Sequence, residues 1–406
     1  MRIGTVIPSG VEGPPRWSRR LAAALICALA LVAFAVPAAA ANVVDIPVIL
    51  PLTGAASFLG RGVQQGLQGV EDQTNLTGGI GGKKLHFSYQ DDQSSPKVAV
   101  QLMNGVQAQK PPIVFGSAIV ATCRAMAALI KDGPVLYCLS PGLHPEDKSF
   151  AFSANVSTAD SIDAGIGYLI KSGISRIGVI TATDSTGQDA DKSIDDTVAA
   201  AKGAITIVAR EHFNPADVSV SAQISKIKAA NPQAVIAWTT GTPVATVFRA
   251  IKDSGMDVPV YTSNGNSITD SLKQWDAFLP ANLLLPVQAN VIVPSPATDR
   301  AGKAALTTYF AAMKKLGVTA DVMNGTGWDP GTMIVEALRK LGPSVTAESL
   351  RQYINDQSNY VGIFGKYDFH NSPQRGLSRD AVYIARWNST KLTWTAMSHP
   401  GGVPLK

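Results

Sequence analysis

Cysteine is scarce in this chain, and its scarcity argues against a cysteine-ligated metal site. Three cysteines occur in 406 residues, and Cys27 lies in the apolar N-terminal segment. Cys123 and Cys138 remain, too few for the clustered ligands that a zinc site needs. In an oxidising compartment these two residues can pair, or they can be two buried thiols that act as small hydrophobic groups. Their spacing does not decide between the two, because pairing depends on geometry.

Catalytic signatures are also missing. The chain contains neither a Gly-x-Ser-x-Gly nucleophile elbow nor a His-Glu-x-x-His metal motif. The glycine-rich stretch Gly78–Lys84 lacks the Walker spacing and precedes a predicted strand, which favours a tight turn over a phosphate loop. The sequence therefore predicts no enzyme activity and no metal or cofactor. The histidines show no metal-ligand spacing; they are His86, His144, His212, His370 and His399.

The N-terminus has the three parts of a secretory signal peptide. Arg16, Arg19 and Arg20 precede the uncharged apolar run Leu21–Pro37, and four alanines, residues 38–41, follow it. We expect cleavage near Ala40 or Ala41, with residues 1–41 removed and the mature protein exported to the periplasm. The alternative is a retained membrane anchor, because the uncharged stretch is long enough to span a bilayer.

Positive charge is sparse in the mature part of the chain. The formal net charge is +5 for the full sequence and falls to +2 without residues 1–41. No cluster of lysine and arginine remains, so nucleic-acid binding has little electrostatic support.

The rest of the chain alternates between short apolar runs and helical patterns at a spacing of roughly 30 residues, which is typical of parallel sheets flanked by helices. The predicted strands are Val43–Leu50, Lys84–Gln90, Ile113–Gly116, Val135–Ser140, Arg176–Thr181, Ile205–Arg210, Ala234–Thr239 and Val258–Thr262. The predicted helices are Arg61–Asn75, Pro96–Ala108, Thr122–Lys131, Thr158–Lys171, Gln188–Lys202, Asp217–Ala230 and Thr242–Ser254. After Leu285 long helices follow, and then a strand-rich tail with strands at Gly365–Phe369, Ala381–Trp387 and Leu392–Ala396.

The loops after the strands are rich in hydroxyl, amide and glycine groups. In open parallel sheets, ligands gather at the carboxyl ends of the strands. We therefore expect a site that binds without reacting, in which a helix start near Thr122 offers free amides to an anion. Capping and turn formation are the alternative for each loop taken singly. The candidate ligand-binding residues are Phe58, Ser117, Thr122, Ser140, Gly142, His144, Ser185, Thr186, Thr240 and Asn264.

Several motifs, in this order, resemble the branched-chain amino-acid type of periplasmic solute-binding protein, the receptor of an ABC importer. They are Ile49–Gly54, the turn Gly78–Leu85, Asp91-Asp92 with Pro96, Leu139–Pro141, Asp184–Gly187 and Trp328–Pro330. The resemblance implies two Rossmann-like lobes with parallel-rich sheets, joined by three crossovers and closing over one ligand. It implies that residues 42–157 with 288–365 form lobe one, and that residues 158–287 with 366–406 form lobe two.

The resemblance also implies how a ligand is held. Amino-acid-binding members hold the ligand carboxylate at the positions of Thr122 and Gly142–His144. These members commonly have an aromatic residue before the glycine that follows the fifth strand, and this chain has Thr186 there instead. The loop Ser263–Asn266 lacks the acid that often meets a ligand ammonium, although Asp184 could replace it if it does not cap a helix. Because a buried ammonium needs an acceptor, we expect an organic acid without an amine, aromatic or otherwise apolar.

Three functions are compatible with these observations. We expect a monomeric receptor that captures a small carboxylate, an amino acid or an organic acid, and delivers it to a membrane ABC permease. The same cleft could instead serve a sensor that signals to a membrane kinase or chemoreceptor. An exported enzyme is the third alternative, and it would require a nucleophile–base pair that the sequence does not reveal.

Overall fold

The computed structural model describes residues 43–292 and 299–405, together with Met1, Gly4 and Gly10. The signal peptide predicted at residues 1–41 therefore lies outside the described residues apart from these three positions, and its cleavage stays a prediction. Among the described residues, no helix combines the length and hydrophobicity that crossing a membrane requires.

The first half of the chain builds a five-stranded sheet with the order β2-β1-β3-β4-β5. β1, β3, β4 and β5 pair in parallel. β3 and β4 are buried along their whole length, as expected for strands covered on both faces. The strands are β1 Val43–Leu50, β2 Lys84–Asp91, β3 Ile113–Gly116, β4 Val135–Cys138 and β5 Ala151–Ser153, and the helices between them are α2 Ser57–Leu76, α3 Pro96–Ala108 and α4 Val120–Ala127.

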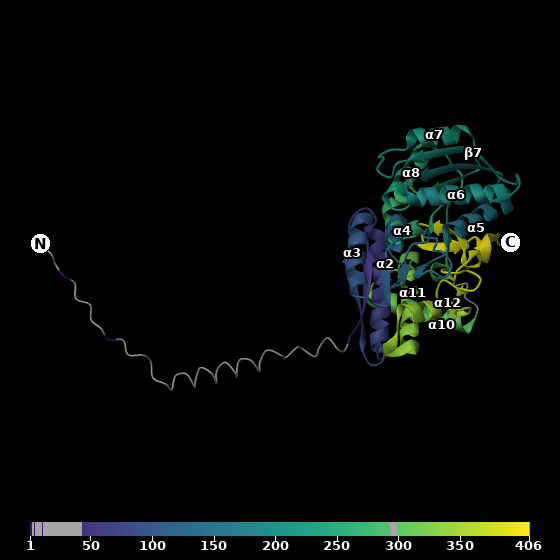
Figure 1. Ribbon diagram of the computed structural model, residues 1–406. Helices are drawn as coiled ribbons and strands as arrows, with labels where there is room; N and C mark the ends of the chain where they lie inside the picture. Colours follow the sequence, from purple (N-terminus) through teal and green to yellow (C-terminus); the bar gives the residue numbers. More distant parts are fainter. Residues whose placement is uncertain (2–3, 5–9, 11–42, 293–298, 406) are drawn as a thin grey trace. The chain divides into compact units, whose positions relative to one another are not determined.

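The second sheet has seven strands in the order β14-β13-β10-β9-β8-β6-β7. Its five earlier strands are parallel, whereas β13 and β14 are antiparallel. Figure 1 shows α6, α7 and α8 gathered around β7 and its neighbouring strands. The strands are β6 Arg176–Ala182, β7 Thr206–Phe213, β8 Ala234–Trp238, β9 Val260–Thr262, β10 Leu283–Val287, β13 Tyr383–Asn388 and β14 Thr393–Ala396, and the helices are α5 Thr158–Lys171, α6 Ser185–Ala200, α7 Ser221–Ala229, α8 Thr242–Asp253 and α9 Thr269–Trp275.

The last third of the chain contributes to both regions. α11 (Val322–Leu341) packs against α2, whereas β13 pairs with β10. The remaining helices are α10 Arg300–Leu316 and α12 Ala347–Asn355, and two short hairpins are formed by β11 Tyr360–Val361 with β12 Lys366–Tyr367 and by β15 Ser398–His399 with β16 Val403–Pro404. The assignment of the late helices and strands to two lobes, with its boundaries, stays a prediction.

Side-chain caps explain where several helices begin. The Ser95 side chain accepts a hydrogen bond from the amide of Val98, and Ser95 precedes a proline at the start of α3. The Ser157 side chain accepts a hydrogen bond from the amide of Asp160 at the start of α5. Asp321 and Asn324 form a reciprocal capping box at the start of α11. These caps fix the direction in which each helix leaves its loop.

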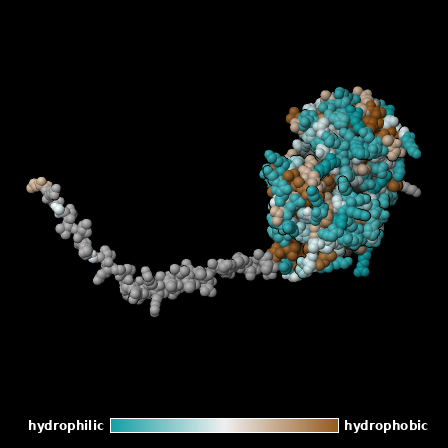
Figure 2. Space-filling view, in the orientation of Figure 1, coloured by the Kyte–Doolittle hydropathy of each residue, from teal (hydrophilic) through white to brown (hydrophobic). Residues whose placement is uncertain are grey.

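Apolar side chains are concentrated inside this framework. The visible face in Figure 2 is mainly hydrophilic, and hydrophobic patches are scattered over it. The sheets contribute fully buried side chains such as Phe115, Tyr137 and Tyr261. The cores under the two sheets therefore provide the rigid support on which the loops at the strand ends are held.

Glycines allow α2 and α11 to approach each other closely. A Cβ atom at Gly66 would collide with the Asn324 carbonyl oxygen, which is backbone and cannot move aside. We expect Gly66→Ala to lower the free energy of unfolding by about 1–3 kcal/mol, the usual range for overpacking. Gly105→Ala at an exposed position of α3 is the matched control, since nothing lies within 4 Å of its Cβ position. The control should be more stable than wild type by about 0.5–1 kcal/mol. Equal changes in the free energy of unfolding for the two variants, measured by urea unfolding, would contradict this account.

Candidate ligand-binding site

Loops from both sheets surround one cavity of about 210 Å³. Five of the ten candidate residues line it: Phe58, Ser140, Thr186, Thr240 and Asn264. A larger hollow of about 600 Å³ is formed mainly by residues 359–366 and 378–383. We place the site in the smaller cavity because the loops that follow eight strands, β1–β4 and β6–β9, meet there, as expected for parallel sheets.

The start of α4 presents free backbone amides to this cavity. Its N-cap residue is Ile119, which is extended and has no side chain that can cap the helix. The amides of Val120, Ala121 and Thr122 therefore find no acceptor among the described residues. Because Ala118, Ile119 and Val120 line the cavity, the positive end of the helix dipole is available to an anion there.

Four hydroxyl groups and one amide in the cavity wall have unused hydrogen-bonding capacity. The side chains of Ser140, Thr158, Thr186, Thr240 and Asn264 make no hydrogen bond to another described residue. Ser140 is 1% exposed and Asn264 is 4% exposed. Burying such groups without partners is unfavourable, so their convergence in one cavity indicates a polar ligand.

Aromatic and aliphatic side chains form the remainder of the wall. Trp238 at the end of β8 and Met323 in α11 are buried lining residues. Phe58 in α2 packs against Gly241, where a Cβ would lie 2.5 Å from its ring and where φ is +76°. Glycine at position 241 therefore allows an aromatic ring to approach the turn before α8, and the cavity combines a polar set with an apolar surface.

Asp184 contributes the one ionisable side chain among the cavity's lining residues. Its Oδ1 accepts hydrogen bonds from the amides of Thr186 and Gly187, both at 3.0 Å, and thereby caps α6. The side chain is exposed. Of the two roles considered for Asp184, helix capping is the one the structure shows.

Ser117 and Thr122 do not line the cavity. The Ser117 hydroxyl donates to Asp92 Oδ2 at 2.6 Å, and both residues are fully buried. Burial raises the pKa of Asp92, and the bond from Ser117 opposes that shift. Thr122 is also fully buried, and its hydroxyl has no partner among the described residues. The helix begins at Val120, so its start lies near Thr122 as expected, and Thr122 is its third residue.

Gly142, His144 and Ser185 also lie outside the cavity wall. His144 Nε2 lies 2.7 Å from Asp189 Oδ1 on α6, and Arg124 Nη2 lies 3.7 Å from the same oxygen. Gly142 packs between α4 and α6, where a Cβ would approach Val120 Cγ2 to 2.6 Å. Gly142, His144 and Arg124 therefore hold α4 and the loop after β4 against α6. A role of Gly142, His144 and Ser185 in ligand contact stays a prediction.

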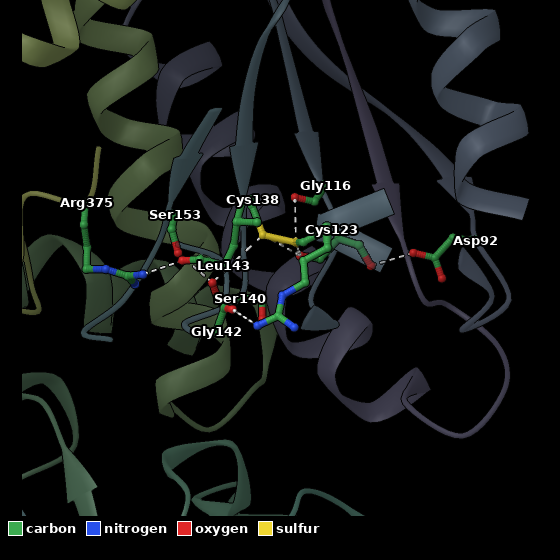
Figure 3. Close-up of a disulfide and its surroundings, with 11 residues drawn as sticks. Asp92, Gly116, Cys123, Cys138, Ser140, Gly142, Leu143, Ser153 and Arg375 are labelled. Atoms are coloured by element: carbon green, nitrogen blue, oxygen red, sulfur yellow. Dashed lines mark hydrogen bonds between the residues drawn. A yellow bond between two sulfur atoms is a disulfide. The ribbon is translucent and has the colours of Figure 1, made fainter. Parts of the chain in front are cut away.

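A disulfide lies behind this part of the cavity. Cys123 in α4 and Cys138 at the end of β4 are bonded, with a Cα–Cα distance of 5.9 Å. The structure thus decides the alternative that the spacing left open. Figure 3 shows the bond next to Ser140 and Gly142, and Arg375 reaching the Leu143 carbonyl oxygen. The covalent link fixes the start of α4 relative to the loop that carries Ser140.

Thr158 is a lining residue that the sequence analysis missed. It is the first residue of α5 and follows β5, a three-residue strand that was not predicted. Without that strand, the start of α5 could not be assigned to a sheet edge. The signal that could have identified it is Ser157, an N-cap residue directly before the helical pattern.

Comparison with known proteins identifies the family. A family model described as periplasmic binding protein matches residues 43–391, and the chain belongs to this family. Leu/Ile/Val-binding protein homolog 3 of Brucella melitensis biotype 1 is 22% identical over 356 residues, which cover 86% of this chain and 92% of that protein. The resemblance to the branched-chain amino-acid-binding type is thereby confirmed.

Solved structures show the same fold. The branched-chain amino acid transporter substrate binding protein LivJ from Streptococcus pneumoniae, in complex with isoleucine, has a TM-score of 0.74 at 18% identity and covers 87% of this chain and 99% of its own. The leucine binding protein LivK from Thermotoga maritima MSB8 has a TM-score of 0.75 at 19% identity, and the match covers 87% of this chain and 97% of LivK. The predicted α/β class with parallel-rich sheets is confirmed.

Proposed function

We propose that this chain is a periplasmic receptor that captures a small carboxylate, an amino acid or an apolar organic acid, and delivers it as a monomer to a membrane ABC permease. The observation that carries the proposal is the cavity, in which free amides of α4 and five unpaired neutral side chains meet an apolar wall. The amides suit a carboxylate. The hydroxyls fix its orientation, and Phe58 and Trp238 cover an apolar substituent.

The size of the cavity supports a ligand of this kind. A volume of about 210 Å³ exceeds the engineered cavity of about 150 Å³ that admits benzene. A carboxylic acid with a short branched or aromatic substituent therefore fits. The relatives support the same class, because their names specify leucine, isoleucine and valine, and the LivJ structure contains isoleucine.

The proposal includes hinge closure of two lobes, residues 42–157 with 288–365 and residues 158–287 with 366–406. Contacts between residues of the two proposed lobes support it. Phe58 in α2 packs against Gly241 before α8, and His144 pairs with Asp189 on α6. A ligand that touches the loops of both sheets would bind the closed arrangement more tightly than the open one, and would therefore shift the equilibrium towards closure.

Titration of the mature protein with a panel of small carboxylates tests the proposal. We expect saturable one-to-one binding in calorimetry and a higher melting temperature with the ligand. Thr186→Trp places a large side chain in the cavity and should abolish binding. Ser185→Trp is the matched control, since this neighbouring residue is similarly half-buried but does not line the cavity.

Two results would count against the proposed function. One is a panel of amino acids and organic acids that neither binds nor shifts the melting temperature. The other is unchanged binding in a folded Thr186→Trp protein, which would remove the ligand from this cavity.

A further inference from the structure

We propose that the ligand is a carboxylate that carries a neutral oxygen group, an oxo or hydroxyl group, where an amino acid carries its ammonium. This inference rests on the proposed function and narrows its substrate class. It differs from the expectation raised by the relatives, whose names specify amino acids.

The charges in the cavity wall are the first argument. A bound amino acid has one negative and one positive group, and the free amides of α4 can serve only the negative one. Asp184, the one ionisable lining residue, is exposed and points its Oδ1 at the start of α6. The positive end of the α6 dipole stabilises the negative charge of Asp184. A sequestered ammonium would therefore lack a dedicated counter-charge, which is costly.

Asn264 provides the second argument. It lines the cavity, is 4% exposed, and its Nδ2 has no hydrogen-bond partner among the described residues. A neutral amide can donate to an oxygen atom and can accept one hydrogen bond in return. It cannot compensate a full positive charge. The Nδ2 atom is closed off in the structure, and a turn of the side chain into the cavity would let a ligand oxygen supply the acceptor that the protein does not.

The neighbouring Asn266 shows that the position of Asn264 is set by the fold. Asn266 Oδ1 accepts the Gly241 amide at 3.0 Å, and its Nδ2 donates to the Thr239 carbonyl oxygen at 2.8 Å. These bonds tie the loop after β9 to the loop after β8. Thr240 and Asn264 are thereby held together in the cavity wall, where Thr240 Cγ2 lies 2.9 Å from the Cβ position of Gly265. One asparagine is fully used in the structure, and the other is left for a ligand.

Two matched sets of three acids test the proposal by calorimetry on the mature protein. The aliphatic set is 4-methyl-2-oxopentanoate, leucine and 4-methylpentanoate, and the aromatic set is phenylpyruvate, phenylalanine and 3-phenylpropanoate. Within the set that fits the cavity, we expect the oxo acid to bind roughly tenfold or more tightly than the amino acid, because an unpaired buried charge is strongly disfavoured. The acid without either group should bind between them.

Asn264→Asp supplies a second, independent readout. The substitution keeps the size of the side chain and adds the missing negative charge, so it should raise affinity for the amino acid and lower it for the oxo acid. Wild-type protein that binds the amino acid more tightly than the oxo acid would overturn the inference while leaving the proposed function intact. An unchanged ratio of the two affinities in Asn264→Asp would also overturn it. If none of the six acids bound, the proposed function itself would fail, and this inference with it.

Discussion

Replacing Val120 with proline should weaken binding of the carboxylate ligand by about 10- to 100-fold while the protein stays folded. Val120 is the first residue of α4, and its amide is one of the free donors at the cavity. Proline removes this N–H group. A hydrogen bond to a charged group contributes about 1.5–3 kcal/mol, and 1.4 kcal/mol corresponds to a tenfold change in Kd.

The backbone at this position already suits proline. Proline is favoured at the first position of a helix, where its missing N–H has no intrahelical role. The residue before a proline must be extended, and Ile119 has φ −117° and ψ 133°. The helix should therefore form normally, and circular dichroism should show no loss of helical structure.

Val120→Ala separates the effect of the amide from that of the side chain. Val120 is buried next to Gly142, so shortening it removes some packing in both variants. The alanine variant keeps the amide and should bind within a few-fold of wild type. Calorimetry on the three proteins measures the difference. Equal affinities for the proline and alanine variants would show that this amide does not hold the carboxylate.

Local sequence patterns predicted most of the fold because strands and helices here follow short-range rules. β1 and β3 have the predicted bounds, since these mainly apolar segments end before Pro51 and at Gly116. β10 (Leu283–Val287) lies at the point where the regular alternation ends, and it was not predicted as a strand. It is nevertheless a strand, with Pro286 opposite Ile384 of β13. Pairing across about 100 residues is not visible in a local window.

The candidate site could be predicted only in part, because the sequence does not show which polar groups are already paired. Ser117 looked like a free hydroxyl, but its partner Asp92 lies 25 residues away. His144 is paired with Asp189, 45 residues away. α4 starts after the apolar residue Ile119, and no side-chain cap marks this helix start in the sequence. The general position, at strand ends, was predictable; the individual contacts depend on tertiary pairing.

The largest loss of stability is expected at Asp329, a fully buried carboxyl group in the Trp-Asp-Pro segment of α11. It accepts hydrogen bonds from the amides of Ile363 (2.8 Å) and Phe364 (3.0 Å) and from the hydroxyl of Tyr367 (3.0 Å). Gly362 leaves room for the carboxyl group, since a Cβ there would collide with it. Asp329 therefore binds the segment that leads from α12 towards β13 to the centre of α11.

Asp329→Ala should lower the free energy of unfolding by roughly 3–5 kcal/mol, because each buried donor left unpaired costs about 1–3 kcal/mol. Urea unfolding followed by tryptophan fluorescence measures this loss. Asp329→Asn is the matched control, since it keeps one oxygen acceptor and nearly the same volume. It should lose clearly less stability than the alanine variant. A loss below about 1 kcal/mol for Asp329→Ala would mean that water replaces the carboxyl group in this place.

The same pair of proteins, wild type and Asp329→Asn, tests the protonation state of the buried carboxyl group. Burial raises the pKa of Asp329 from 3.8 to about 6, and the three hydrogen bonds only partly oppose the shift. The folded protein therefore binds this proton more tightly than the unfolded chain. The resulting stabilisation is fully present below pH 3.8 and is lost as the pH rises through 6. The stability advantage of wild type over Asp329→Asn should thus shrink between pH 4 and pH 8, by about 1–3 kcal/mol. An advantage that grows with pH would instead indicate a carboxylate whose three donors lower its pKa.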